Sequence, residues 1–117
     1  MKGERKITPE DNLCFYGHTH IPTVIRIDTK DPLRYPVRIH LKTTTELRED
    51  SLWVVNPGSV GQPRNQDSRA SYCILEETDK GRTITYHYIG YDIDKVKAKI
   101  KEAKFPEVLG KRLEFGK

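Results

Sequence analysis

Hydrophobic residues occur along the chain in short runs separated by polar segments with glycine and proline, a pattern that predicts β-strands joined by turns. Residues 13–16 are wholly apolar, and we expect a strand buried on both faces, while 52–55 predicts a second buried strand. Residues 37–41 alternate strictly, as a strand with one solvent-facing side does, and 43–45 would prolong it. The other predicted strands are residues 23–28, 70–76 and 82–91, the last two forming a hairpin.

The pattern changes to a helical period after residue 91. Asp92 suits the N-cap of a helix, and we expect the apolar stripe of this helix to pack on the sheet. A second short helix begins at Pro106, with Gly116 at its C-cap position. The sequence therefore predicts an α+β fold, a mostly antiparallel sheet with two C-terminal helices. The stripe consists of Ile93, Val96, Ile100 and Ala103.

The first candidate for chemistry is Gly17-His18-Thr19-His20, directly after the first apolar run. In an extended segment, side chains two residues apart project to the same side about 6.5–7 Å apart, so His18 and His20 would present both imidazoles to one pocket. Gly17 lets the backbone leave the strand sharply, and Pro22 restrains it on the far side. Paired histidines also occur as ordinary strand or surface residues, so spacing alone leaves metal binding and a structural role open.

A second turn follows the apolar run 52–55, with the sequence Asn-Pro-Gly-Ser-Val-Gly-Gln-Pro-Arg at residues 56–64. Together with the histidine turn, it resembles the C-terminal half of the calcineurin-like metallophosphoesterases, in particular the small bacterial and archaeal phosphodiesterases. The resemblance continues through residues 69–72, 91–92 and 106–116, and so covers nearly the whole chain. For the fold, it implies the second half of a four-layer αββα sandwich.

For the site, the resemblance implies that His18 ligates the second metal ion and His20 the first, in a centre of two divalent manganese, iron, nickel or zinc ions. The family's other ligands lie in Asp-x-His, Gly-Asp and Gly-Asn-His motifs and a further single histidine. Those three motifs do not occur in this sequence. The resemblance thus makes residues 1–117 the C-terminal part of a phosphoesterase domain, without its N-terminal metal-binding half and without a catalytic residue of its own.

Three polar residues of the second turn have two readings each. Asn56 and Ser59 have short side chains suited to bonding local backbone groups, so they serve a structural turn alone or one that also holds the histidine ligands in place. Arg64 carries a planar guanidinium shaped for a substrate phosphate, although an arginine in a polar loop is also commonly just solvated.

The remaining histidines, and the tyrosines Tyr86 and Tyr88, are interpreted as structural. His40 shares the polar side of its strand with charged neighbours, which indicates a solvent-facing side chain. His87 lies between Tyr86 and Tyr88 in mid-strand, and we expect it to be packed or hydrogen-bonded. We expect both tyrosines to pack on the sheet.

Composition narrows the function classes. The formal net charge is +4, but basic and acidic residues are interleaved and no RNA-binding or zinc-finger motif occurs, so we expect no specific nucleic-acid partner. Cys14 and Cys73 have no CxxC spacing, which favours a reduced, cytoplasmic protein. No apolar run approaches the length of a membrane span, so we expect no membrane partner.

The favoured function is the C-terminal lobe of a metal-dependent phosphodiesterase that is inactive by itself and acts on a phosphodiester once completed. We expect it to pair with a complementary N-terminal lobe or with itself through the sheet that carries the histidine turn. The reason is that four apolar side chains there would lose cover: Leu13, Phe15, Trp53 and Val55. A non-catalytic interaction module or an orphan fragment that keeps the fold is the alternative, and a basic nucleic-acid binder is a third reading.

Overall fold

The computed structural model describes residues 12–41 and 43–117, which form two β-sheets followed by two helices. One sheet has the strand order β1-β5-β2-β3 and the other has the order β4-β7-β6. The strands of the first sheet are β1 (Leu13–Phe15), β2 (Thr23–Asp28), β3 (Pro36–Ile39) and β5 (Ser51–Asn56). Those of the second are β4 (Thr44–Glu46), β6 (Ala70–Thr78) and β7 (Gly81–Ile89).

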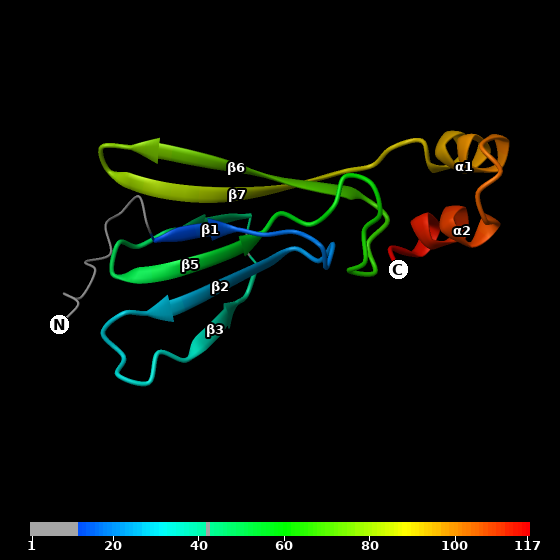
Figure 1. The fold of residues 1–117 in the computed structure, drawn as a ribbon. Helices are drawn as coiled ribbons and strands as arrows, with labels where there is room; N and C mark the ends of the chain where they lie inside the picture. The colour runs from blue at the N-terminus through cyan, green and yellow to red at the C-terminus, as the bar shows by residue number, and fades with distance from the viewer. Residues whose placement is uncertain (1–11, 42) are drawn as a thin grey trace.

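Strand direction explains why the two sequence motifs meet. Strand β1 runs parallel to β5, with Leu13 beside Trp53 and Phe15 beside Val55, and the other neighbouring pairs are antiparallel. Because parallel strands end at the same edge of a sheet, the histidine turn that follows β1 and the Asn-Pro-Gly-Ser turn that follows β5 lie at one end of the sandwich (Figure 1). The expected α+β fold with mostly antiparallel strands is confirmed.

The two sheets pack face to face around one hydrophobic core (Figure 1). Alternate residues of each strand point into it, so Trp53 and Val55 are buried while Leu52 and Val54 lie on the outer face of the first sheet and are half-buried. The core consists of Val24, Leu47, Trp53, Val55, Ile84 and Tyr86.

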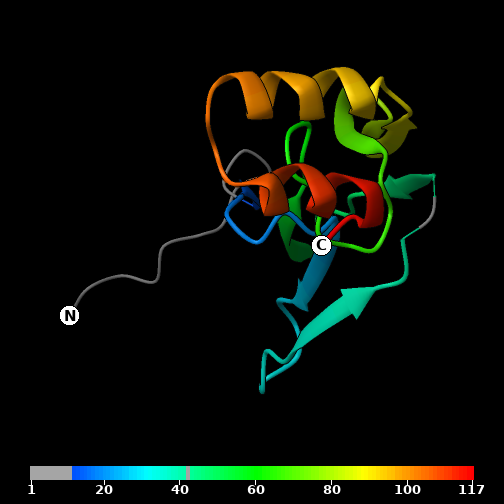
Figure 2. The ribbon, with the colours of Figure 1, turned by 90° about the vertical axis from the view of Figure 1, so that its right-hand side faces the viewer.

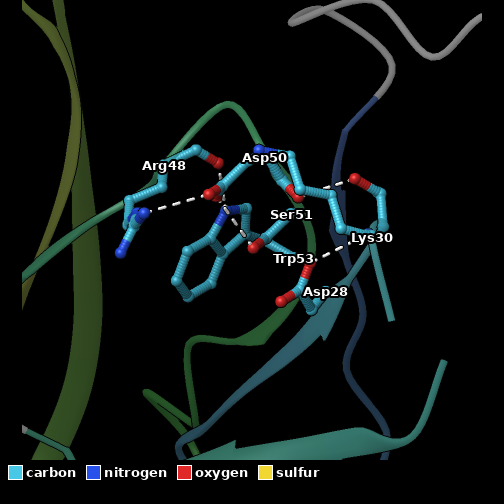
Figure 3. Close-up of polar contacts among 7 residues, drawn as sticks. Asp28, Lys30, Arg48, Asp50, Ser51 and Trp53 are labelled. Carbon is cyan, nitrogen blue, oxygen red and sulfur yellow. Dashed lines mark hydrogen bonds and ion pairs between the residues drawn. The ribbon is translucent and has the colours of Figure 1, made fainter. Parts of the chain in front are cut away.

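At the end of the sandwich away from the histidine turn, polar contacts fix the connection between β4 and β5 (Figure 3). The indole Nε1 of Trp53 donates to the carbonyl oxygen of Arg48 at 2.9 Å. The Arg48 guanidinium donates to the Asp50 carboxylate at 3.0 Å, and Ser51 Oγ donates to the same carboxylate at 3.1 Å. These contacts place the Trp53 ring in the core at the start of β5.

The burial of the first sheet differs from expectation in two ways. Strand β1 is not buried on both faces, because it is an edge strand: Cys14 is exposed and Phe15 is 46% exposed. The expected loss of cover at Trp53 and Val55 is wrong, since they are 3% and 0% exposed. The second sheet covers them, and sequence patterning does not show which sheet faces which.

Residues 44–46 do not prolong the strand before them. They form β4, which pairs with β7 in the second sheet, with Thr45 beside Ile84. The chain therefore crosses from one sheet to the other between Ile39 and Thr44. A polar threonine run fits either pairing, so periodicity could not distinguish them.

Helices α1 (Ile93–Glu102) and α2 (Glu107–Phe115) have the expected caps. Asp92 accepts a hydrogen bond from the Lys95 amide at 3.0 Å, and Gly116 ends α2 in the left-handed conformation, with φ 62°. Among the described residues, neither helix has the length and apolar character to cross a membrane.

The expectation that α1 packs on the sheet is wrong. Strand β7 leads the chain out of the end of the sandwich, so α1 begins beyond the sheet and packs against α2 (Figures 1 and 2). No residue of α1 is buried, whereas Leu113 of α2 is buried. The carbonyl oxygen of Gly116 accepts a hydrogen bond from the Gln66 amide at 2.9 Å, which ties the end of α2 to the loop between β5 and β6.

Candidate metal site at the strand ends

The histidine turn begins just after β1 with a tight, strained loop. The Thr19 amide donates to the carbonyl oxygen of Gly17 at 2.9 Å, and His18 between them has φ 72°. A hydrogen bond across one residue with a positive central φ defines the rare, strained form of the γ-turn. His20 also has a positive φ, 60°. Such conformations cost on the order of 1–3 kcal/mol each and persist only where the surroundings hold them.

The extended backbone on which the histidine spacing argument rested is therefore wrong. His18 and His20 both lie on one short turn, but the left-handed dihedrals of this turn, rather than the pleat of a strand, set their relative direction. Contacts with Asn56 at the end of β5 and with Gln62 of the loop after it hold the turn, in addition to the restraint expected from Pro22.

His20 has the hydrogen bond that a metal-ligating imidazole typically makes. Its Nδ1 lies 2.8 Å from the carbonyl oxygen of Gln62. A carbonyl only accepts, so Nδ1 carries the proton in this contact, and in the neutral ring Nε2 keeps its lone pair for a ligand. Metal-binding histidines usually orient themselves through such a bond from the other ring nitrogen. His18 is exposed, and its imidazole forms no hydrogen bond with another described residue.

Asn56 holds both ends of the strained γ-turn. Its side chain is fully buried, with 0% exposure. The amide Nδ2 donates to Thr19 Oγ1 at 2.8 Å and to the Gly17 carbonyl oxygen at 3.3 Å. The Oδ1 atom accepts from the Gly58 amide at 2.9 Å, which shapes its own turn. One side chain thus links the two motifs that are separate in the sequence.

Ser59 acts on the histidine turn indirectly, through Gln62, whereas Arg64 contacts the turn through its backbone amide. Ser59 Oγ accepts from the amides of Gly61 and Gln62, at 3.1 and 2.8 Å, and so shapes the loop that presents the Gln62 carbonyl to His20. The Arg64 amide donates to the His20 carbonyl oxygen at 3.3 Å. The exposed Arg64 guanidinium donates to Gln62 Oε1 at 2.9 Å.

Sequence reasoning missed four residues that build this site. Thr19 and Gln62 are the direct partners of Asn56 and His20. Ser71 Oγ donates to the Pro57 carbonyl and accepts from the Ser59 amide, and the Tyr86 hydroxyl donates to the Asn56 carbonyl. The last two lie on β6 and β7, far along the chain, and no local pattern indicates them.

The other two histidines lie outside the site, as expected. His87 stacks on Tyr72 with the ring centroids 5.0 Å apart, which confirms that it is packed, and His40 is exposed. Among residues 12–41 and 43–117, no three histidine, cysteine, aspartate or glutamate side chains gather closely enough to hold a metal ion. The described residues therefore bring two imidazoles, those of His18 and His20, to the strand ends.

Comparisons with known proteins identify similar chains. The uncharacterized protein MJ0912 of Methanocaldococcus jannaschii is 41% identical over 106 residues, covering 91% of this chain and 40% of that protein. The crystal structure of a metallophosphoesterase from Sphaerobacter thermophilus matches with a TM-score of 0.75 and 38% identity, covering 91% of this chain and 42% of that one.

This chain thus spans less than half the length of both relatives. The calcineurin-like phosphoesterase superfamily domain matches residues 2–80, which include both turns of the candidate site. The resemblance drawn from these two motifs is confirmed: the chain belongs to the calcineurin-like phosphoesterase superfamily.

Proposed function

We propose that the chain contributes His18 and His20 as ligands to a divalent-metal site of a phosphodiesterase, and that ligands from outside the described residues complete the site. The observation that carries the proposal is the hydrogen bond from His20 Nδ1 to the Gln62 carbonyl at 2.8 Å. This bond leaves the Nε2 atom free to ligate a metal ion. The strained turn that carries His20 is held in shape by the buried Asn56.

The number of ligands supports the need for completion. Zinc sites normally use three or four protein ligands. The described residues hold no group of three candidate ligands, so His18 and His20 are short of a full set. The relatives are more than twice as long as the segment that matches, so they have room for further ligands in the rest of their chains. A complementary lobe is therefore the proposed source.

Members of the family generally use divalent metal ions. When bound, such ions stabilise charge on phosphate oxygens and lower the pKa of a coordinated water. The residues of this chain have separate tasks in the proposal. Asn56 holds the turn in its strained shape, and Ser59 shapes the loop whose Gln62 carbonyl orients His20. Manganese, iron, nickel and zinc are all compatible with a site of mixed histidine and aspartate ligands, and two ions are proposed for the completed site.

Arg64 is the proposed substrate contact. Arg64 is exposed, and its backbone amide donates to the His20 carbonyl oxygen. One of its N–H groups is engaged by Gln62, and the planar fork leaves others for a phosphate oxygen. We propose a phosphodiester as the substrate class, bound jointly by the metal ions on the histidine turn and by Arg64.

We expect the chain alone, with added manganese, to hydrolyse a generic phosphodiester no faster than its His18→Ala, His20→Ala double variant. The reason is that nucleophile generation and charge stabilisation need fully liganded ions. Mixed with the part of the Sphaerobacter thermophilus protein that lies outside the matched segment, the chain should gain activity that the double substitution abolishes. The measurement is the initial rate of release of nitrophenol from bis-nitrophenyl phosphate.

Two outcomes would count against the proposal. Turnover by the chain alone that the double substitution abolishes would show that its own residues complete the site. A stable mixed complex without any activity would favour the non-catalytic interaction module.

We propose that the complementary lobe, or a second copy of the chain, binds along β1 and the outer face of the first sheet. Strand β1 has one neighbour, β5, so its other edge is free among the described strands. Phe15 on this edge is 46% exposed. Exposed edges and apolar faces are where chains associate. The outer face carries Cys14, Ile25, Leu52 and Val54, none of them fully buried.

Sedimentation at micromolar concentration should show self-association of the chain, which addition of the complementary region converts to a mixed complex. Phe15→Lys should shift the chain toward monomer, because a charge on an edge strand opposes pairing. Phe105→Lys is the matched control, since Phe105 is exposed and lies between the two helices. A monomer that binds no hydrophobic dye, or equal effects of the two substitutions, would contradict the proposed surface.

A further inference from the structure

Tyr86 connects the two sheets at the point where the candidate site begins. It lies on β7 with its side chain 3% exposed. Its hydroxyl is 2.6 Å from the carbonyl oxygen of Asn56 and 3.3 Å from that of Thr23. Asn56 is the last residue of β5, Thr23 is the first of β2, and the two are paired in register. A single hydroxyl of the second sheet therefore binds the strand ends of the first.

Asn56 transmits this contact to the histidine turn. Its backbone is held by Tyr86, and its side chain holds Thr19 and Gly17 on either side of the left-handed His18. The amide of an asparagine can keep several hydrogen bonds only while its backbone stays in one position. The left-handed conformation of His18, in turn, persists only while it is held from outside.

We propose that Tyr86 is a positioning residue for the histidine turn: its hydroxyl fixes the Asn56 backbone, and Asn56 thereby holds His18 and His20 in the geometry for binding a metal ion. The consequence for metal binding rests on the function proposed above. The positioning itself concerns only contacts within the chain.

The hydrogen bond of the hydroxyl distinguishes this role from simple packing. A phenylalanine would fill the core as well as the Tyr86 ring does, but it would remove the hydroxyl that donates to the carbonyl oxygen of the fully buried Asn56. Burial also raises the pKa of the Tyr86 hydroxyl far above its usual value, so the group stays protonated and acts as a donor.

The test compares Tyr86→Phe with Tyr88→Phe. Tyr88 is the control because it lies two residues away on the same face of β7, its ring centroid is 6.5 Å from that of Tyr86, and its hydroxyl makes no hydrogen bond with another described residue. The first readout needs no metal and is amide hydrogen exchange measured by NMR. We expect Tyr86→Phe to speed exchange at Thr19 and Gly58 about tenfold more than at the paired amides of β2 and β5, and Tyr88→Phe to cause no such difference.

The second readout is zinc affinity, measured by isothermal titration calorimetry. Loss of a residue that orients a metal ligand typically lowers affinity about 10–100-fold, and we expect a fall in this range for Tyr86→Phe alone. Should the wild-type chain bind no zinc through His18 and His20 even when it is mixed with the complementary lobe, the proposed function fails, whereas the exchange data still decide the positioning role. Exchange that rises equally at all amides would overturn that role, because it would report general destabilisation only.

A substitution at the surface tests the same positioning role without disturbing the core. Thr19→Val removes the acceptor that Asn56 Nδ2 bonds, and Thr19 is exposed. We expect this variant also to speed exchange at the Gly58 amide. Combined with Tyr86→Phe, its effect on exchange should be smaller than the sum of the two single effects, because both substitutions remove contacts that hold Asn56. Full additivity would overturn the proposal.

Discussion

Replacing both His18 and His20 with alanine is expected to lower the zinc affinity of the chain by more than about 100-fold, because losing a residue that merely orients a ligand already costs 10–100-fold. His20 has its Nδ1 bonded to the Gln62 carbonyl and its Nε2 free, and His18 is exposed on the same turn. Isothermal titration calorimetry at neutral pH measures the affinity of the wild-type chain and of the variant.

The matched control is the His40→Ala, His87→Ala variant, which removes the other two histidines of the chain. His40 is exposed and His87 stacks on Tyr72, so neither lies on the histidine turn. We expect the affinity of this variant to stay within about twofold of wild type. If both double variants lost affinity equally, binding would be a general property of surface imidazoles, and the proposed site would be wrong.

Gly58→Ala is expected to lower the free energy of unfolding by about 3 kcal/mol or more. Gly58 has φ 91°, and a Cβ there would lie 1.9 Å from Ser71 Oγ and 2.8 Å from Pro22 Cγ. The left-handed backbone costs an alanine roughly 1–2 kcal/mol. Overpacking of a well-filled site adds about 1–3 kcal/mol. To relieve the clash, Ser71 would have to give up its bonds to the Ser59 amide and the Pro57 carbonyl.

Urea unfolding followed by circular dichroism measures the effect, with Gly61→Ala as the control from the same loop. Gly61 has no positive φ, and nothing lies within 4 Å of a Cβ built there. We expect Gly61→Ala to change stability by less than about 0.5 kcal/mol. Equal urea midpoints for the two variants would show that the Asn-Pro-Gly-Ser turn tolerates a side chain at Gly58 and is not tightly packed against Ser71 and Pro22.

The sequence predicted correctly those features of the helices and strands that depend on neighbouring residues. Asp92 caps α1 and Gly116 ends α2 as their residue types indicated, because capping depends on a few neighbouring residues. The errors concern partners instead. The pattern did not show that β1 is an edge strand, that residues 44–46 join the second sheet, or that α1 packs on α2.

The candidate site likewise has features that the sequence indicated and contacts that it did not. The two turns were recognised because their residues are contiguous in the sequence. The bond between Asn56 and Thr19 joins residues 37 positions apart, and that between Tyr86 and Asn56 joins residues 30 positions apart. Neither has a sequence spacing that recurs by rule, as helix or strand neighbours do. The expectation that Tyr86 packs on the sheet is confirmed, but it did not indicate which group the hydroxyl contacts.

The amino-acid sequence by itself determined the strand and helix propensities, the caps and the two turns at the ends of apolar runs, since these follow from backbone and side-chain preferences within a few residues. Only the tertiary structure decided the left-handed shape of the histidine turn and the direction of its imidazoles. That conformation is unfavourable locally and exists because Asn56, Gln62 and Tyr86, brought in from other strands and loops, hold it in place.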